Sequence, residues 1–83
     1  MRVTEEALNR SRRAVEEAIS QLQANNASLS NEIAPQLNDW DDRYKQVFLD
    51  LITQYNSYVK VCIGSLERID STLSDCIKML NNY

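Results

Sequence analysis

The segment LNDWDDRYKQVF (residues 37–48) separates two heptad patterns and contains the only tryptophan of the chain, Trp40, among three aspartates. Apolar residues recur at heptad spacing before this segment, and a second, wider heptad pattern follows it. Pro35, just before the segment, lacks an amide hydrogen and disfavours helical geometry at its preceding residue. Either Asp39 or Asp41 can cap a new helix. The segment therefore predicts a bend between two helices.

Length and composition limit the chain to one small helical domain. Its 83 residues include one glycine and one proline, which disfavours a fold that depends on many tight turns. Residues of high helix propensity dominate the sequence. We therefore expect a single all-α domain over residues 1–83. It should be an antiparallel two-helix hairpin, with helices at about 4–37 and 41–81 and a bend at Trp40. The sequence leaves two alternatives for the first helix, a kink near Pro35 or an end there.

The first expected helix carries a narrow apolar stripe. Thr4 and the two glutamates after it have the pattern of an N-cap followed by acids that favour the positive end of the helix dipole. Trp40 continues the stripe, so we expect it at the apex, closing the end of the core while remaining only partly covered. The stripe has two rows, and the polar Asn26 in the second row is of the type that sets register. The rows are Leu8, Val15, Leu22 and Leu29, and Arg12, Ile19, Asn26 and Ile33.

The second expected helix has an apolar face that is wider than one neighbouring helix can cover. It needs a further partner, so we expect hairpins to pair into a four-helix bundle. Gly64 lies inside this helix at a cost of about 1 kcal/mol in propensity, and we expect a close helix contact to account for it. The expected partner interface consists of Leu51, Ile52, Tyr55, Tyr58, Val59, Cys62, Ile63, Leu66, Ile69 and Leu73.

Charge and hydropathy argue against two classes of partner. Twelve acidic and nine basic residues give a net charge of −3, whereas general nucleic-acid binders neutralise phosphates with lysine and arginine. No apolar run approaches the roughly 20 residues that span a bilayer. The start of the sequence also lacks the apolar region of a cleaved signal peptide. We therefore expect neither nucleic-acid binding nor membrane insertion.

The residue types that carry catalysis and metal binding are sparse. The chain has no histidine, which removes Cys–His and Ser–His–Asp nucleophile arrangements. Cys62 and Cys76 lie about 21 Å apart along one helix, too far for a disulfide, and we expect them to be small core residues. A calcium loop starting at Asp39 would need glycine where Tyr44 stands. We expect no enzymatic activity, no cofactor and no metal, and a surface that binds protein.

The chain resembles the small helical-hairpin proteins of bacterial type VII secretion, known as ESAT-like or Trp-x-Gly proteins. Its opening RVTEEALNRSRRAVEEAISQL is similar to the usual start of that family, a Val-Thr-(Pro)-Glu-Glu-Leu stretch that leads into the first helix. LNDWDDRYKQVF falls where the family has Leu-x-x-x-Trp-x-Gly-x-x-x-x-x-Phe, matching Trp40 and, approximately, Leu37 and Phe48. Asp42 stands where the motif has glycine, and the C-terminal Tyr-x-x-x-Asp/Glu signal of the family is missing.

The resemblance implies a function in protein export. Family members pair into four-helix bundles as homodimers or heterodimers. The bend of one chain and the C-terminal signal of its partner form a composite export signal that a membrane-bound ATPase reads. A chain with the bend, here Trp40, Asp42 and Phe48, but without the tail signal resembles members that act as targeting partners of larger toxins.

Three expectations follow for partners and location, together with one alternative function. The partner is an effector with an LXG-type N-terminal domain, another small hairpin protein, or a second copy of this chain. The secretion ATPase is contacted through the composite signal. The protein resides in the bacterial cytoplasm and is open to export by the type VII pathway without a cleaved signal peptide. The alternative function is that of a structural coiled-coil adaptor or scaffold subunit with no export role.

Overall fold

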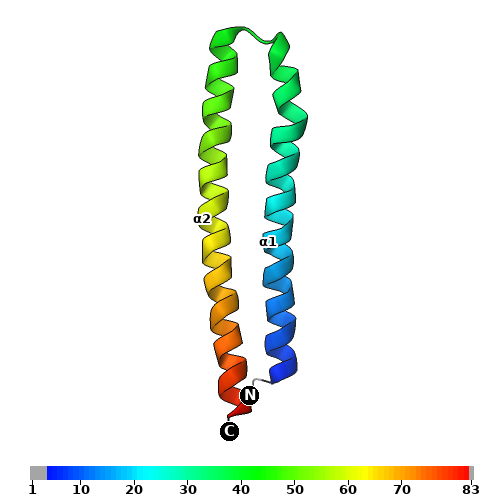
Figure 1. Ribbon diagram of the computed structural model, residues 1–83, viewed down its shortest axis with the longest axis vertical. Coiled ribbons are helices and arrows are strands. Elements are labelled where there is room, and N and C mark those ends of the chain that lie inside the picture. Colours follow the sequence, from blue (N-terminus) through cyan, green and yellow to red (C-terminus); the bar gives the residue numbers. More distant parts are fainter. Residues whose placement is uncertain (1–3, 83) are drawn as a thin grey trace.

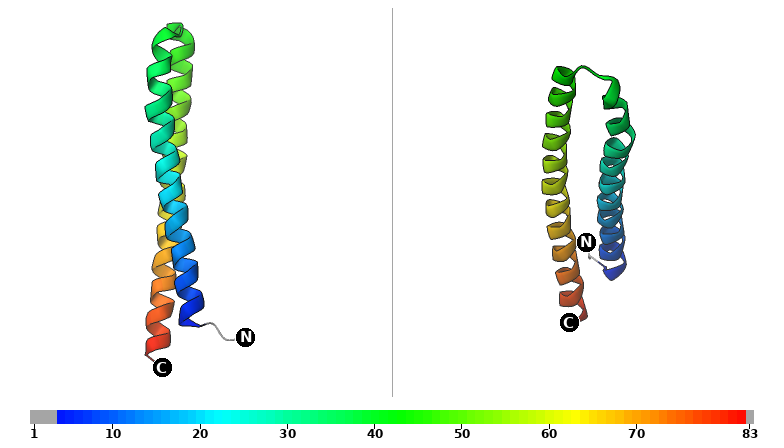
Figure 2. Two further views of the ribbon diagram at one scale, coloured as in Figure 1. Left: turned by 90° about the vertical axis from the view of Figure 1, so that its right-hand side faces the viewer. Right: turned by 45° about the horizontal axis from the view of Figure 1, so that its top comes forward.

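The computed structural model describes residues 4–82, which form a hairpin of two long helices (Figure 1). The elements are α1 (Glu5–Ile33), the short 3₁₀ segment η1 (Ala34–Asp39) and α2 (Asp42–Asn81), and the described residues contain no strand. The two helices lie side by side and antiparallel, and they cross at a shallow angle (Figure 2). The molecule measures 63 × 19 × 17 Å. The expected all-α two-helix hairpin is confirmed.

The start of α1 follows the capping pattern in the sequence. Thr4 is extended, and its hydroxyl oxygen accepts a hydrogen bond from the amide of Ala7 at 3.1 Å. Glu5 and Glu6 occupy the first turn, where the helix dipole favours negative charge. The cap satisfies one of the amide groups that every helix leaves unpaired at its start.

The end of α1 comes earlier than the sequence predicted. The α-helix stops at Ile33, and the backbone tightens into η1, with Pro35 in its first turn. Proline has no amide hydrogen, and its ring clashes with the carbonyl four residues back, so α-helical geometry does not continue past it. The tighter 3₁₀ geometry has three residues per turn rather than 3.6. It therefore changes which side chains after Ile33 face the second helix.

The bend itself forms without glycine. Trp40 is extended at φ −90° and ψ 149°, and its amide donates to the carbonyl of Leu37 at 3.1 Å. The carboxylate of Asp41 then accepts a hydrogen bond from the amide of Arg43 at 2.9 Å and caps α2. Of the two candidate caps, Asp41 is the one used. No residue between 4 and 82 has positive φ, so Asp42 can stand where the resembling motif has glycine.

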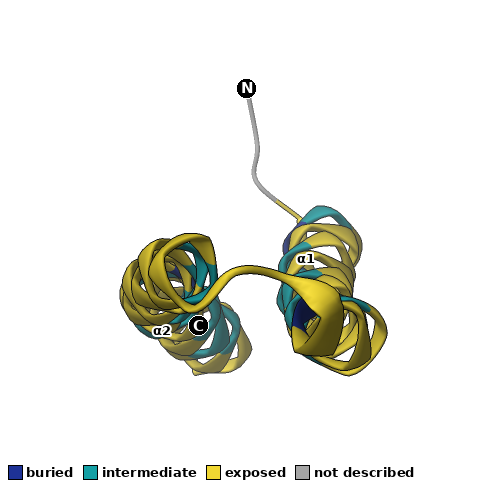
Figure 3. Ribbon diagram, turned by 90° about the horizontal axis from the view of Figure 1, so that it is seen from above, coloured by how far each residue is buried: buried dark blue, intermediate teal, exposed yellow. Residues whose placement is uncertain are grey.

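The core is a thin seam between the two helices. Leu8, Leu37 and Val59 are the buried apolar residues of the described chain, and among them Leu37 is fully buried. The other apolar residues along the contact are half-buried, because a two-helix unit covers each side chain from one side only. Seen along the long axis, the buried and intermediate residues gather on the facing sides of α1 and α2, and the outward sides are exposed (Figure 3).

Three expectations about single residues need correction. Leu37, at 1% exposure, closes the end of the core, while Trp40 is 44% exposed beside it, because η1 changes the rotation of the chain ahead of the bend. Cys62 is exposed and Cys76 half-buried, so Cys62 is not a core residue of the hairpin. A Cβ added at Gly64 would meet nothing within 4 Å, so no close helix contact accounts for this glycine.

Candidate protein-binding surface

Helix α2 carries two apolar stripes, and only one of them faces α1. The side chains of this inner seam are buried or half-buried along the whole contact. Most of it is apolar, but two of its positions are polar. We define the inner seam of α2 as Ile52, Asn56, Val59, Ile63, Leu66, Asp70, Leu73 and Ile77.

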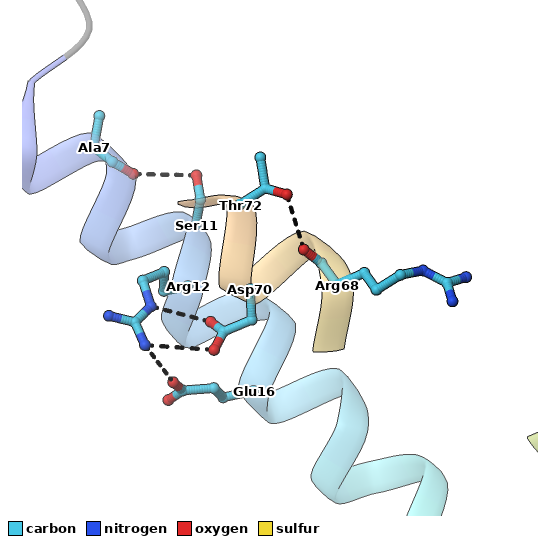
Figure 4. A network of polar contacts seen from close by, with 7 residues as sticks. All are labelled: Ala7, Ser11, Arg12, Glu16, Arg68, Asp70 and Thr72. Atoms are coloured by element: carbon cyan, nitrogen blue, oxygen red, sulfur yellow. Dashed lines mark hydrogen bonds and ion pairs between the residues drawn. The ribbon is translucent and has the colours of Figure 1, made fainter. Parts of the chain in front are cut away.

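An ion pair across the helices shows the register of the inner seam (Figure 4). Arg12 of α1 donates through Nε to Asp70 Oδ1 at 3.1 Å and through Nη2 to Asp70 Oδ2 at 3.4 Å. Glu16 lies 3.8 Å from the same guanidinium. The hydrogen bond to Asp70, together with the charge of that carboxylate, raises the pKa of the Arg12 guanidinium. This two-pronged geometry joins the open ends of the two helices at one alignment.

A second pair of polar residues fits the alignment that places Arg12 opposite Asp70. Asn26 lies fourteen residues after Arg12 in α1, and Asn56 lies fourteen residues before Asp70 in α2. In antiparallel helices, equal steps in opposite directions keep residues opposite each other. The side-chain oxygens of Asn26 and Asn56 are both buried and without a hydrogen-bond partner. The two asparagines therefore share a layer of the seam.

The second stripe of α2 lies beside the inner seam and is mostly exposed, with Phe48, Ser65 and Cys76 half-buried. Its residues alternate at spacings of four and three, the pattern of a helix face that packs against another helix. Tyr44 and Tyr58 are 66% and 69% exposed, and Leu51 is 55% exposed. We define this outer seam as Tyr44, Phe48, Leu51, Tyr55, Tyr58, Cys62, Ser65, Ile69, Thr72, Cys76 and Met79.

The two halves of the outer seam differ in side-chain size. The half next to the bend carries the large residues, among them three tyrosines, a phenylalanine and a leucine. The half next to the end of α2 carries Ser65, Thr72 and Cys76 among larger aliphatic residues. Here the surface is hollowed into an open groove of about 340 Å³, and its walls are mainly apolar. The groove is lined by Ser65, Arg68, Ile69, Thr72 and Leu73.

The bend presents a partly covered aromatic pair. The rings of Trp40 and Phe48 meet edge to face, with centroids 5.3 Å apart and planes at 69°. Phe48 belongs to the outer seam, so the indole of Trp40 extends the apolar surface of α2 around the closed end of the hairpin. Asp39, Asp41 and Asp42 are exposed around it. The end of the hairpin thus combines an accessible indole with three negative charges.

The structure separates the residues that the sequence grouped as one partner interface. Val59 is buried by its own hairpin, and Ile52, Ile63, Leu66 and Leu73 are half-buried in the inner seam. The remaining members lie exposed on the outer seam: Leu51, Tyr55, Tyr58, Cys62 and Ile69. The sequence reasoning missed Asp70 and Asn56 as parts of the inner seam. Their signal was present, because both interrupt the apolar row of Ile63 and Ile77 at heptad spacing.

No protein-family model, curated protein or solved structure matches this chain. Among residues 4–82, no group of three or more His, Cys, Asp or Glu side chains is arranged to hold a metal ion. No helix in the described part of the chain is both long and apolar enough to cross a bilayer. The outer seam and the aromatic pair at the bend are therefore the features on which a function can be argued.

Proposed function

We propose that this chain is a small partner protein of type VII secretion that pairs through its outer seam with a second helical hairpin, forming a four-helix bundle. The observation that carries the proposal is the outer seam, a mainly apolar row of side chains that its own hairpin leaves largely exposed. Large contiguous apolar surfaces of this kind mark sites of protein association. The candidate partners are an effector with an LXG-type N-terminal domain, another small hairpin, or a second copy.

The bend supports the export part of the proposal. Trp40 lies at the turn of the hairpin, in the segment that resembles the Trp-x-Gly motif, and its indole is 44% exposed. Partly covered aromatics are typical binding anchors, worth about 2 kcal/mol or more when a partner desolvates them. In the proposed complex, Trp40 and a tail signal supplied by the partner together contact the secretion ATPase. The protein acts in the bacterial cytoplasm and accompanies its partner to that ATPase.

A structural coiled-coil adaptor without an export role is the second candidate. One departure from the resembling family favours it, namely Asp42 at the glycine position. The genes that neighbour this one distinguish the two functions. A neighbouring gene for an LXG-type toxin or for a secretion ATPase favours the export role, and genes for an unrelated scaffold favour the adaptor.

Replacing the indole tests the export role in the organism that encodes the chain. We expect Trp40→Ala to remain helical and to keep its partner in co-purification, yet to abolish appearance of that partner in the medium. Val47→Ala, which truncates another exposed side chain near the bend, is the matched control and should secrete normally. Immunoblots of cell and medium fractions, with a strain lacking the secretion ATPase as reference, measure the effect.

Two results would contradict the export role. One is normal secretion of the co-purified partner by the Trp40→Ala strain. The other is unchanged secretion when the ATPase is deleted, which would leave the adaptor as the better description. Circular dichroism of the purified Trp40→Ala protein separates these outcomes from simple unfolding.

A further inference from the structure

We propose that Arg68 determines which protein binds the groove end of the outer seam. The occupant is an amphipathic helix of a different protein, which places an aspartate or glutamate against Arg68 and an apolar side chain in the groove. The inference rests on the proposed function in one respect, that the outer seam binds protein, and it names the chemistry of that protein. It does not depend on a role in export.

Arg68 lies in surroundings that contain no acidic side chain on its own helix. Residues three and four positions apart are neighbours on a helix surface. At these distances from Arg68 stand Gly64, Ser65, Ser71 and Thr72, which are small and uncharged. Nη2 of Arg68 donates to Ser65 Oγ at 3.2 Å. The other hydrogen-bond donors of the guanidinium are open to a further acceptor.

The contrast with the other basic residues makes this position unusual. Apart from Arg68 and Lys60, every lysine and arginine of the chain has an aspartate or glutamate three or four positions away. Arg12 also pairs across the helices with Asp70, whereas no ion pair among residues 4–82 includes Arg68. Figure 4 shows the two arginines side by side, with the guanidinium of Arg68 extending away from α1 and from Asp70. Lys60 does not line the groove.

The groove gives this free cation an apolar neighbour. Ile69 and Leu73 supply apolar wall, and the small Ser65 and Thr72 leave the space open, about 340 Å³ in volume. An ion pair on an open surface contributes little, because water screens it. A side chain seated in the groove would displace water beside the guanidinium, and a charge-assisted hydrogen bond there is stronger. The site therefore favours a ligand that is apolar at one point and negatively charged at the next.

A helix meets both requirements with two side chains. The lining residues run from Ser65 to Leu73, about 12 Å along α2. A carboxylate one turn away from a large aliphatic or aromatic residue lies on the same face of its helix. Such a pair would place the apolar residue in the groove and the carboxylate on Arg68. The planar guanidinium also matches the two oxygens of a carboxylate, which favours aspartate and glutamate over neutral acceptors.

The composition of the outer seam favours a different protein over a second copy. None of the residues in the outer seam is acidic. The outer seam of another copy would thus offer apolar side chains to the groove but no carboxylate to Arg68. A helix with aspartate or glutamate among its apolar residues would satisfy both.

Affinity measurements with the natural partner test the role of Arg68. The tagged full-length chain is purified from the organism that encodes it, the bound protein is identified by mass spectrometry, and both chains are then titrated by calorimetry. We expect Arg68→Gln to weaken binding about tenfold, because a charged hydrogen bond is lost. Arg68→Lys should weaken it less, since the charge stays and the planar fork is lost. Lys60→Gln, which removes the other cation with acid-free neighbours, should change the affinity less than about twofold.

A charge exchange identifies the acid of the partner. Arg68→Glu should bind more weakly than Arg68→Gln, and replacing one aspartate or glutamate of the partner with arginine should restore its affinity. If no such replacement restores binding, or if Arg68→Gln binds as tightly as Lys60→Gln, the inference is wrong. A purified chain that forms only its own dimer would also overturn it.

A second pair of variants tests the groove without changing charge. Thr72 and Thr53 are both exposed threonines of α2 whose hydroxyls bond to the carbonyl four residues back, and Thr53 lies outside the groove. Thr72→Leu should fill the groove and weaken binding about tenfold, whereas Thr53→Leu should leave it unchanged. Circular dichroism confirms that each variant remains helical. Equal affinities of the two variants would contradict the docking of a side chain in the groove.

These results separate the inference from the export role. Binding that depends on Arg68, together with secretion independent of the ATPase, keeps the inference and removes the export role. Binding indifferent to Arg68, together with secretion that requires the ATPase and Trp40, removes the inference and leaves the export role intact.

Discussion

At the residue scale, the closed end of the hairpin shows how one backbone change reassigns two side chains. Leu37 and Trp40 are separated by one turn of 3₁₀ backbone, yet Leu37 is 1% exposed and Trp40 is 44% exposed. Pro35 causes the switch, because it ends α-helical geometry and so takes Trp40 out of the heptad that it would otherwise continue. The smaller side chain therefore closes the core, and the larger one is left for a partner.

This division predicts unequal costs of truncation. Leu37→Ala should lower the free energy of unfolding by about 2–5 kcal/mol, since it leaves a cavity at a fully buried site. Trp40→Ala should cost about 1 kcal/mol, chiefly the edge-to-face contact with Phe48. Urea denaturation followed by circular dichroism, at matched protein concentration, measures both, with Leu80→Ala as a half-exposed leucine control. Equal losses for Leu37→Ala and Trp40→Ala would mean that the indole belongs to the core.

At the element scale, α2 is a helix with two apolar seams and α1 a helix with one. α1 is polar outside its apolar stripe, and the inner seam of α2 covers that stripe. α2 continues as a regular helix through Gly64, with no close neighbour at that position. Helix continuity here rests on packing along the inner seam rather than on the propensity of each residue.

Gly64 is therefore a site where the helix can be strengthened. Gly64→Ala should raise the free energy of unfolding by about 1 kcal/mol, because alanine loses less backbone entropy and its Cβ enters open space. Ala24→Gly, at an exposed position of α1, is the matched control and should lower stability by a similar amount. Thermal unfolding monitored at 222 nm reports both changes. A loss of stability in Gly64→Ala would show that a partner packs closely over this position.

At the scale of the whole molecule, two polar layers align the helices. The Arg12–Asp70 pair and the Asn26–Asn56 layer share one register, so sliding α2 along α1 would separate both at once. The unpaired side-chain oxygens of Asn26 and Asn56 lower the stability of the native alignment. A shifted alignment would be less stable still, because it would place each polar side chain opposite apolar ones. The seam thus loses some stability at its centre and gains a defined alignment.

The asparagine layer predicts a stabilised double variant. Asn26→Leu combined with Asn56→Leu should raise the free energy of unfolding by on the order of 2 kcal/mol, since two unpaired carbonyl oxygens are removed and apolar contact is gained. Asn26→Leu alone should gain less, because Asn56 then faces only apolar atoms. Urea midpoints of the wild type, both single variants and the double variant form the required cycle. A double variant less stable than the wild type would show that the two amides bond to each other.

Much of this architecture was determined by the sequence alone. Heptad spacing predicted both helices. Local side-chain chemistry predicted the N-cap Thr4 of α1 and offered Asp41 as a cap of α2. The width of the apolar pattern on α2 indicated a face that α1 cannot cover. These features depend on interactions within a few residues, which a linear pattern records. The family resemblance likewise depends on linear features, namely the opening stretch, the segment around Trp40 and the order of the two helices, and what it implies about function stays a prediction.

Tertiary structure decided which of the two seams on α2 faces α1. Residues of both seams are apolar enough to form a core, and the sequence analysis therefore grouped them in one interface. The outer seam contributed Leu51, Tyr55 and Tyr58 to that group, and the inner seam contributed Ile52, Val59 and Ile63. The Arg12–Asp70 contact joins α1 to a residue of the inner seam. The inner row of α2 therefore faces α1, and the outer row faces solvent. The same holds at the bend, where the angle introduced by η1, rather than the apolar character of either residue, buries Leu37 and exposes Trp40. Helix rotation depends on contacts between distant segments, and a periodic pattern on one helix does not contain them.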